Sequence, residues 1–292
     1  MKGQELRGAS TGHSGAPRAN TAVVFMSAAR YSGSTLLGVM LGAHPSIFYA
    51  GEATKIWHFA DPSAPLKNRE CKLCGPGCTV WGDLRVDNRE DLYEMLSRRT
   101  RCPIVFDSTK GINRVRLQLA ALRGLAPLYL IVLTRDGRAV VNSDLRKWPE
   151  TSAYDHAAAW VERMHGVEEL ASCWPGAVHR VRYEELALRP ESTLRALADF
   201  LGVAFDPAML DPWDSDQHPI GGNPGPLLLF SRERAKVVVN PDEKTCDWYG
   251  AHPRGIVLDL RWKREMNADA LAVFEAVAGE TNRAYSWEEP VE

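Results

Sequence analysis

Long apolar runs are missing from this sequence of 292 residues. A membrane-spanning helix needs roughly 18 or more consecutive apolar residues, and no stretch approaches that length. Residues 1–20 also lack the apolar centre of a secretory signal peptide. We therefore expect a cytoplasmic protein without a membrane partner.

An excess of charge of either sign is missing as well. Lysine and arginine total 35 against 37 acidic residues, which gives a formal net charge of -2. A nucleic-acid-binding surface usually needs a clear positive excess, so nucleic acid is not an expected partner. Any anionic ligand must instead be bound by a local group of residues.

The organisation of the chain follows from composition. Residues 1–20 are polar and rich in glycine, serine and alanine, and we predict a disordered tail because such a segment cannot bury a core. Residues 21–292 show no internal repeat and no compositional break, and they are predicted to form a single domain. No pattern indicates an oligomeric state.

Half of the six cysteines lie close together in the segment CKLCGPGC, as Cys71, Cys74 and Cys78. In a reducing compartment this spacing is typical of a metal clip or a redox pair. Zinc needs a fourth ligand, and His58 is a candidate that nothing in the pattern ties to the cluster. The alternative is a turn-rich excursion whose cysteines are buried or free.

A strand-turn-helix unit spans residues 21–41. Its first part is a short apolar run, and leucine and methionine then recur at helical spacing after a turn of small residues at 32–35. Such a turn directs unpaired backbone N–H groups and the positive end of the helix dipole at one point, which favours an anion. The alternative is a tight turn that Gly33 permits and that Ser34 or Thr35 caps.

The turn lacks the lysine of the nucleotide-binding pattern GxxxxGK[ST], because it reads Arg30-Tyr31 and then SGST. The expected anion is therefore not the terminal phosphate of ATP or GTP. A P-loop kinase or NTPase, which would need that lysine and a magnesium-binding acid such as Asp107, remains an alternative. A catalytically inactive nucleotide-binding module is another.

Two charged residues of opposite sign follow predicted strands. Glu52 follows the strand at 47–50, and Lys110 follows the strand at 103–107. Open α/β sheets bind ligands at the carboxyl ends of their strands, so the pair is more informative than either residue alone. Taken singly, each would be an ordinary surface charge.

A second anion-binding turn follows the strand at 128–133, whose continuous apolar residues indicate a parallel strand buried on both faces. Arg135 stands at the strand end and Ser143 two turns into the next helix, where both can reach a phosphate. Further positive charge comes from Arg138, Arg146 and Lys147. The alternative is a capped helix with a solvated basic face.

Strands and helices alternate along the rest of the chain, which predicts an α/β fold with one doubly wound parallel sheet flanked by helices. A fifth strand is predicted at 178–183. The region 207–254 is rich in proline, glycine and aspartate and is a candidate lid, because long irregular segments are often binding loops. The remaining helices are predicted at 89–98, 113–123, 154–170, 190–202 and 258–283.

Two anion-binding turns about a hundred residues apart imply a ligand with phosphate-like groups at both ends. With these two turns, the chain resembles the sulfotransferases that use 3'-phosphoadenosine 5'-phosphosulfate (PAPS). These enzymes carry a 5'-phosphosulfate loop (K/R)SG(S/T)T and a 3'-phosphate motif of strand, arginine and a later serine, which match SGST at 32–35 and Arg135 with Ser143. The resemblance covers roughly residues 21–285 and implies a P-loop-like sulfotransferase fold.

Several segments are similar to the tyrosylprotein-type and bacterial branches. LGAHPSIFYAGE is similar to the stretch with the glutamate base, which falls on Glu52, and FDSTK is similar to the segment with the active-site lysine, Lys110. RDGRAVVNSDLRK is similar to the 3'-phosphate segment, and HPIGGNP to a bacterial acceptor-side loop. The implied donor-binding residues are Arg30, Tyr31, Ser32, Gly33, Ser34, Thr35, Arg135, Ser143, Lys147 and Tyr183.

One position departs from the family pattern, because Tyr31 stands where a basic residue is expected and arginine is one place earlier, at Arg30. The implied reaction is in-line sulfuryl transfer from PAPS to a hydroxyl, with Glu52 as general base and PAP as product. Lys110, with Arg30, would stabilise the developing charge, and no metal is required. The expected acceptor is a small molecule such as a secondary metabolite, and a peptide tyrosine is the alternative.

Overall fold

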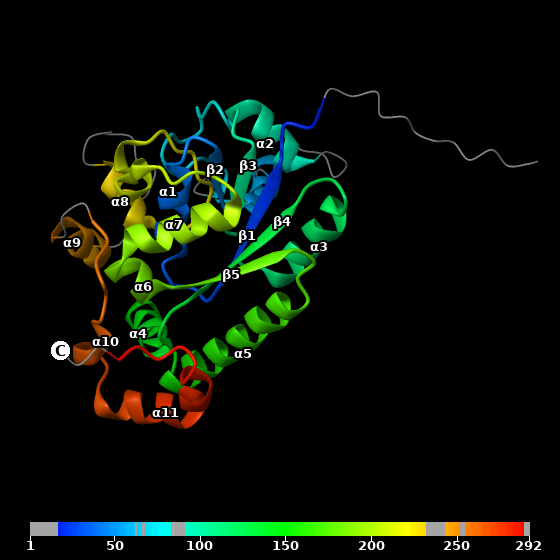
Figure 1. The fold of residues 1–292 in the computed structure, drawn as a ribbon. Coiled ribbons are helices and arrows are strands. Elements are labelled where there is room, and N and C mark those ends of the chain that lie inside the picture. The colour runs from blue at the N-terminus through cyan, green and yellow to red at the C-terminus, as the bar shows by residue number, and fades with distance from the viewer. Residues whose placement is uncertain are drawn as a thin grey trace, which may run out of the picture.

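The computed structural model describes residues 17–61, 63–65, 68–82, 84, 91–231, 243–251 and 255–288. Within them the strands form one parallel sheet of order β2-β3-β1-β4-β5 (Figure 1). The strands are β1 Ala22–Ala28, β2 Ile47–Gly51, β3 Ile104–Asp107, β4 Leu128–Thr134 and β5 Ala177–Arg182. The prediction of a doubly wound α/β sheet is confirmed.

Helices follow the strands in alternation, as the apolar periodicity predicted. The first half of the described chain contains α1 Ser34–Gly42, the 3-10 helix η1 Ala53–Ala60, α2 Leu92–Thr100, α3 Ile112–Leu122, α4 Gly137–Lys147 and α5 Ala153–Ser172. The second half contains α6 Tyr183–Leu188, α7 Pro190–Leu201, η3 Pro207–Leu210, η4 Pro212–Asp214, α8 Pro224–Ser231, α9 Glu243–Ala251, α10 Trp262–Glu265 and α11 Ala268–Asn282.

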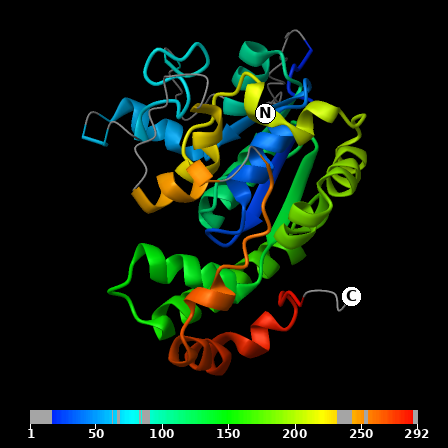
Figure 2. The same cartoon turned by 90° about the vertical axis from the view of Figure 1, so that its left-hand side faces the viewer.

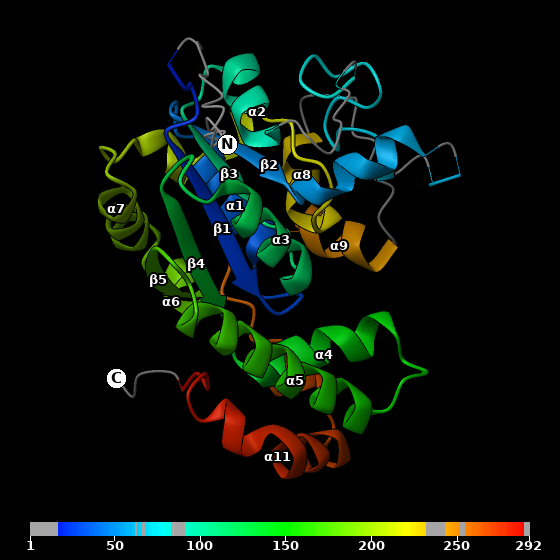
Figure 3. The ribbon, with the colours of Figure 1, turned by 90° about the vertical axis from the view of Figure 1, so that its right-hand side faces the viewer.

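The central strand β1 shows why both faces of the sheet are covered. All its residues are buried, and successive side chains point to opposite faces. Val24 and Met26 belong to a core shared with α1, α7 and α8. Val23 and Phe25 belong to a second core shared with α2, α3 and α5. Figure 2 and Figure 3 show these helix layers on the two sides of the sheet.

A third apolar cluster joins α4, α5 and α11. In Figure 3 these three helices lie together below the carboxyl ends of the strands. They therefore stand next to the edge of the sheet at which the predicted functional residues follow their strands.

Three local predictions need correction. The helix predicted at 258–283 is interrupted, because residues 255–261 form an irregular segment and the Asn267 side chain caps a separate helix, α11, by accepting a hydrogen bond from the Ala270 N–H at 2.8 Å. Tyr183 begins helix α6 instead of ending a strand. The candidate lid at 207–254 contains helices α8 and α9, and its residues 232–242 and 252–254 lie outside the described residues.

The predicted tail also overlaps the fold at its end. Asn20 is buried and its side-chain amide donates to the Pro103 carbonyl at 3.2 Å. Residues 1–16 lie outside the described part of the chain. No helix among the described residues has both the length and the apolar character needed to cross a bilayer. The single domain over 21–292 and the cytoplasmic location stay predictions.

Candidate functional site

The predicted functional residues meet at one edge of the sheet. Parallel strands place all their carboxyl ends at the same edge, so the turns after β1 to β5 converge there. A cavity of about 980 Å³ opens at this edge. Its lining includes the predicted residues Arg30, Tyr31, Gly33, Ser34, Thr35, Glu52, Lys110, Arg135, Ser143, Lys147 and Tyr183.

The cavity is strongly positive although the whole chain carries a formal charge of -2. Its charged lining residues are Arg30, Lys55, Lys110, Arg135, Arg146, Lys147 and Arg261 against Glu52 and Asp259. Such a local excess of cations favours an anionic ligand. The expectation that an anionic ligand is bound by a local group of residues therefore agrees with the residues that line the cavity.

The turn between β1 and α1 leaves the start of the helix open to the cavity. Gly33 occupies the N-cap position in the left-handed region with φ 87°, and no side chain caps the helix. The alternative in which Ser34 or Thr35 serves as the cap is therefore wrong. Thr35 instead accepts a hydrogen bond through Oγ1 from the Asn223 N–H at 2.8 Å, and Ser32 is buried beneath the turn.

Tyr183 explains why only glycine fits at position 33. A Cβ atom at Gly33 would lie 2.7 Å from Cδ2 of the Tyr183 ring, which is closer than real contacts allow. The ring thus packs directly on the anion-binding turn. This contact joins the end of β5 to the end of β1.

Glu52 and Lys110 form an ion pair inside the cavity. The Lys110 Nζ donates to Glu52 Oε1 at 3.1 Å, and the Lys55 Nζ lies 2.8 Å from Glu52 Oε2. Burial opposes ionisation of Glu52, but the two ammonium groups outweigh it and lower the pKa of this carboxyl. Glu52 is therefore ionised at neutral pH. Sequence reasoning missed Lys55, which follows Glu52 by three residues, one turn of a 3-10 helix.

Asp107 holds these two loops in position from below. It is fully buried, and its Oδ1 accepts from the N–H groups of Ala53 at 3.1 Å and Thr109 at 2.8 Å. Its Oδ2 accepts from the Tyr93 hydroxyl at 2.8 Å. Burial raises the pKa of Asp107 despite these bonds. Because its oxygens are engaged beneath the surface, Asp107 does not fit the magnesium-binding role that the kinase alternative needs.

Arg135 connects the two predicted anion-binding turns. Its Nη1 donates to the Tyr31 carbonyl at 2.7 Å, and its guanidinium lies over the Tyr183 ring at 4.4 Å. The side chain is only 7% exposed, and its Nη2 also lies 3.2 Å from Asp259 Oδ2. These contacts fix the first residues of the two turns relative to each other.

The other residues predicted for the second anion-binding turn lie on helix α4. The Ser143 Oγ donates to the Ala139 carbonyl at 2.9 Å, and Ser143 and Lys147 both line the cavity from this helix. Arg30 lies against this helix too, with Nε 2.8 Å from Asp144 Oδ1 and its guanidinium 4.7 Å from the Trp148 ring centre. Burial raises the pKa of Asp144, and Arg30 opposes that effect.

Residues 255–261, here called the strap, complete the cavity wall. The Tyr183 hydroxyl donates to the Val257 carbonyl at 2.6 Å, and Arg135 Nη2 donates to the Asp259 carbonyl at 2.8 Å. Arg261 makes two 2.7 Å contacts with Asp259 and stacks on Trp248 at 3.6 Å. Figure 2 shows the segment before α10, in orange, running past the end of the sheet.

Sequence reasoning assigned most of the strap to a helix. The available signal was Gly255 followed by IVLDLR, in which apolar residues run too closely for one helical face. Its role depends on contacts with Arg135 and Tyr183, which are distant in the sequence.

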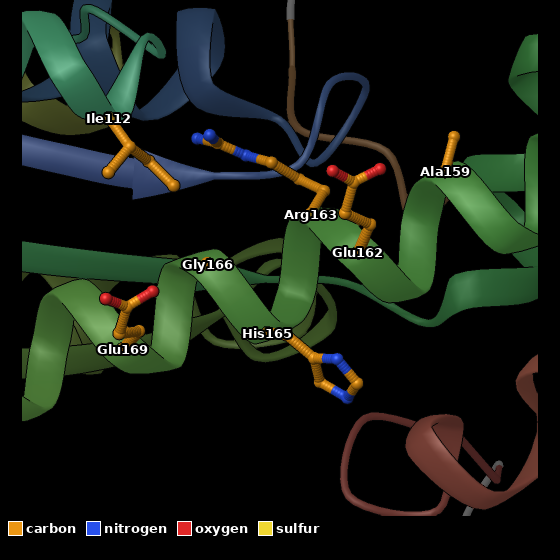
Figure 4. A pocket seen from close by; sticks show the side chains of 7 residues that line it. All are labelled: Ile112, Ala159, Glu162, Arg163, His165, Gly166 and Glu169. Carbon is orange, nitrogen blue, oxygen red and sulfur yellow. The ribbon is translucent and has the colours of Figure 1, made fainter.

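A second hollow lies beside α5 and the start of α3, outside the cavity (Figure 4). It is lined by Ile112, Ala159, Glu162, Arg163, His165, Gly166 and Glu169. Arg163 reaches from α5 toward β1 and donates two hydrogen bonds, of 3.0 and 2.8 Å, to the Ala28 carbonyl. Burial lowers the pKa of Arg163. This arginine supports the end of β1 from behind.

Comparisons with known proteins agree with this geometry. Residues 127–207, which include Arg135, Ser143 and Tyr183, match the model described as "Sulfotransferase family". Among curated proteins, the chain is 24% identical over 263 residues to protein-tyrosine sulfotransferase 1 of Danio rerio, covering 82% of this chain and 68% of that protein. It is also 24% identical over 260 residues to protein-tyrosine sulfotransferase A of Caenorhabditis elegans, covering 81% and 63%.

Solved structures show the same fold. The sulfotransferase domain of the Synechococcus PCC 7002 olefin synthase superposes with a TM-score of 0.57 at 22% identity, covering 92% of this chain and 96% of that domain. The sulfotransferase domain from the curacin biosynthetic pathway gives 0.53 at 20% identity, covering 92% and 99%.

The fold, the match over residues 127–207 and the named relatives together support an α/β enzyme of the sulfotransferase class, as the two motifs predicted. Its relatives are named for protein tyrosine, and its structural neighbours come from biosynthetic enzymes.

Proposed function

We propose that this sulfotransferase takes its sulfuryl group from PAPS and transfers it to a hydroxyl of a small molecule, releasing PAP. The observation that carries the proposal is that both anion-binding turns, Glu52 and Lys110 line a single cavity. One elongated ligand with phosphate groups at both ends can touch both turns there. A carboxylate and an ammonium group then stand beside it.

The donor would be held at both ends. The open N-terminus of α1 and the N–H groups of residues 32–35 suit the 5'-phosphosulfate, since an uncapped helix start attracts an anion. Arg135 suits the 3'-phosphate, and Ser143 would donate to it once its hydroxyl turns away from the Ala139 carbonyl. This phosphate distinguishes PAPS from ATP. The 3'-phosphate would replace the Asp259 carboxylate as a partner of Arg135.

The reaction is a single displacement at sulfur. A bond forms between the acceptor oxygen and sulfur while the bond between sulfur and the 5'-phosphate oxygen breaks. The electron pair of the broken bond leaves with PAP, and the hydroxyl proton passes to Glu52. The transferred group carries less charge than a phosphoryl group, so the N–H groups of the turn and Lys110 suffice to stabilise the charge that develops.

Lys110 is better placed than Arg30 to stabilise that charge. Arg30 is drawn toward α4 by Asp144 and Trp148, whereas Lys110 contacts Glu52 beside the acceptor side of the cavity. We assign Arg30 to donor binding and Lys110 to the reacting oxygens. In this chain a lysine from the loop after β3 would thus do the work of the basic residue absent at Tyr31.

A small acceptor is supported by the apolar residues that line the cavity beyond the two turns. They are Leu36, Pro224, Pro226, Leu229 and Trp248. An apolar pocket with a few convergent polar groups is typical of a small-molecule site. A peptide tyrosine is the second candidate acceptor, because the curated relatives are named protein-tyrosine sulfotransferases.

The test is a transfer assay with PAPS and a panel of phenols, alkyl alcohols and tyrosine peptides, read by mass spectrometry of the products and by release of PAP. We expect sulfated small molecules. Sulfation of peptides alone would replace the first acceptor by the second. No product from any acceptor, together with magnesium-dependent ATP turnover, would contradict the proposal.

Glu52→Gln tests the assigned base in the same assay. The amide keeps the size of the side chain but cannot take a proton, so we expect transfer to fall about 100-fold or more. Affinity for PAP, measured by calorimetry, should stay within a few-fold of wild type. Wild-type turnover in this variant would remove Glu52 from the mechanism.

A further inference from the structure

The three clustered cysteines lie beside a histidine that the sequence did not connect to them. The ligand atoms of Cys71, Cys74, Cys78 and His218 all lie within 4.8 Å of one another. The His218 Nδ1 is 3.1 Å from the Cys74 sulfur and 3.4 Å from the Cys78 sulfur. His58, the fourth ligand considered from the sequence, is exposed on η1 and does not belong to the group.

This group has the composition of a closed zinc site, and its ligand atoms lie close enough together to share one ion. Zinc in structural sites takes four tetrahedral ligands, commonly thiolates and imidazole nitrogens. In a tetrahedral site, bond lengths of about 2.3 Å to sulfur and 2.0 Å to nitrogen place neighbouring ligand atoms about 3.5 to 3.8 Å apart. A disulfide would use only two of the three sulfurs and would leave His218 unexplained.

The outer contact of His218 fits the same role. Its Nε2 lies 3.4 Å from Asp216 Oδ2, while its Nδ1 faces the sulfurs. A histidine that binds a metal through one nitrogen usually donates its other N–H to a carboxylate or carbonyl, which fixes the ring. The orientation of this imidazole is therefore that of a metal ligand.

We propose that Cys71, Cys74, Cys78 and His218 bind one structural zinc ion. The ion would join two segments that are otherwise far apart in the sequence. The excursion at 71–78 already contacts the histidine segment, since the Lys72 N–H donates to the Pro219 carbonyl at 2.9 Å and the Trp81 ring N–H to the His218 carbonyl at 2.5 Å.

The zinc would hold the histidine segment against the cavity. The Ile220 N–H donates to the Ala50 carbonyl at 3.0 Å, and the Glu52 N–H donates to the Ile220 carbonyl at 2.6 Å. Three residues later, Asn223 binds Thr35 of the anion-binding turn. The metal would thus fix the backbone segment to which the Glu52 N–H donates a hydrogen bond and from which Thr35 accepts one. It would take no part in sulfuryl transfer.

The first test measures zinc in untagged protein purified without chelators, by elemental mass spectrometry. We expect about one zinc per chain in the wild type, as a closed site with four ligands binds one ion. Cys74→Ser and His218→Ala should lose it. Cys173→Ser and His58→Ala, which change a free cysteine and a histidine outside the group, should retain it.

The second test needs no variant and so does not depend on whether a variant folds. Hydrogen exchange of the wild type is compared before and after zinc removal by a chelator. The amides of Glu52 and Ile220 should lose protection, while those of the central strand β4 keep theirs. Wild-type protein without zinc, a disulfide among the three cysteines, zinc retained in both cluster variants, or unchanged exchange at Glu52 and Ile220 would overturn the proposal.

Discussion

At the scale of single residues, the site is arranged around Glu52. Two lysines hold its carboxylate, one from the loop after β3 and one from its own 3-10 helix. Their attraction outweighs the effect of burial and lowers the pKa of Glu52. A base with a lowered pKa is a weaker proton acceptor, but it stays in its reactive, ionised form to lower pH.

Lys55→Met tests this electrostatic arrangement. Removing one ammonium group should raise the pKa of Glu52, so the acidic limb of the pH profile of kcat/KM should move to higher pH. The profile is measured with PAPS and a small acceptor between pH 4 and pH 8. Lys263→Met, on α10 outside the cavity, is the control. An unmoved limb in the Lys55 variant would show that Glu52 does not set it.

Gly33→Ala tests the contact between the first turn and Tyr183. Gly124 also has a positive φ, of 77°, but nothing lies near the position of its missing Cβ, so Gly124→Ala measures the backbone strain alone. Each substitution should cost about 1 to 2 kcal/mol of folding free energy from the left-handed backbone. Only Gly33→Ala should also weaken PAP binding, by 10-fold or more. Equal PAP affinity in the two variants would contradict the assigned packing.

At the scale of secondary structure elements, local signals identified the strands and the two anion-binding turns. The apolar run at 128–133 and the small residues at 32–35 can each be recognised from a few neighbouring positions. The structure places them as β4 and the start of α1. The strap and His218 were missed because their roles arise from contacts with residues more than 70 positions away. No periodicity records such contacts.

Tyr183→Phe tests whether the strap is held in place by the hydroxyl of Tyr183, the first residue of α6. The ring would still pack on Gly33 and Arg135, but the bonds to the Val257 carbonyl and from the Asp259 N–H would be lost. We expect a loss of about 1 kcal/mol in unfolding free energy and faster hydrogen exchange in the strap. Tyr129→Phe on β4 is the matched control. Unchanged exchange at 255–261 would disconnect the strap from Tyr183.

At the scale of the whole molecule, basic residues are concentrated in the cavity although the net charge of the chain is small. The composition is nearly neutral, yet seven basic residues line the cavity against two acidic ones. Composition therefore excluded a general polyanion-binding surface but could not reveal the local concentration of cations. That concentration depends on the sheet, which brings the ends of β1, β2, β3, β4 and β5 to one edge.

The central claim is that two separate turns bind opposite ends of one bisphosphorylated adenosine. Calorimetry with 3',5'-ADP and 5'-AMP on the wild-type protein tests it most directly, because the two ligands differ only in the 3'-phosphate. Charge-assisted hydrogen bonds contribute about 1.5 to 3 kcal/mol, so 3',5'-ADP should bind about 10- to 150-fold more tightly. Equal affinity for the two nucleotides would contradict the account.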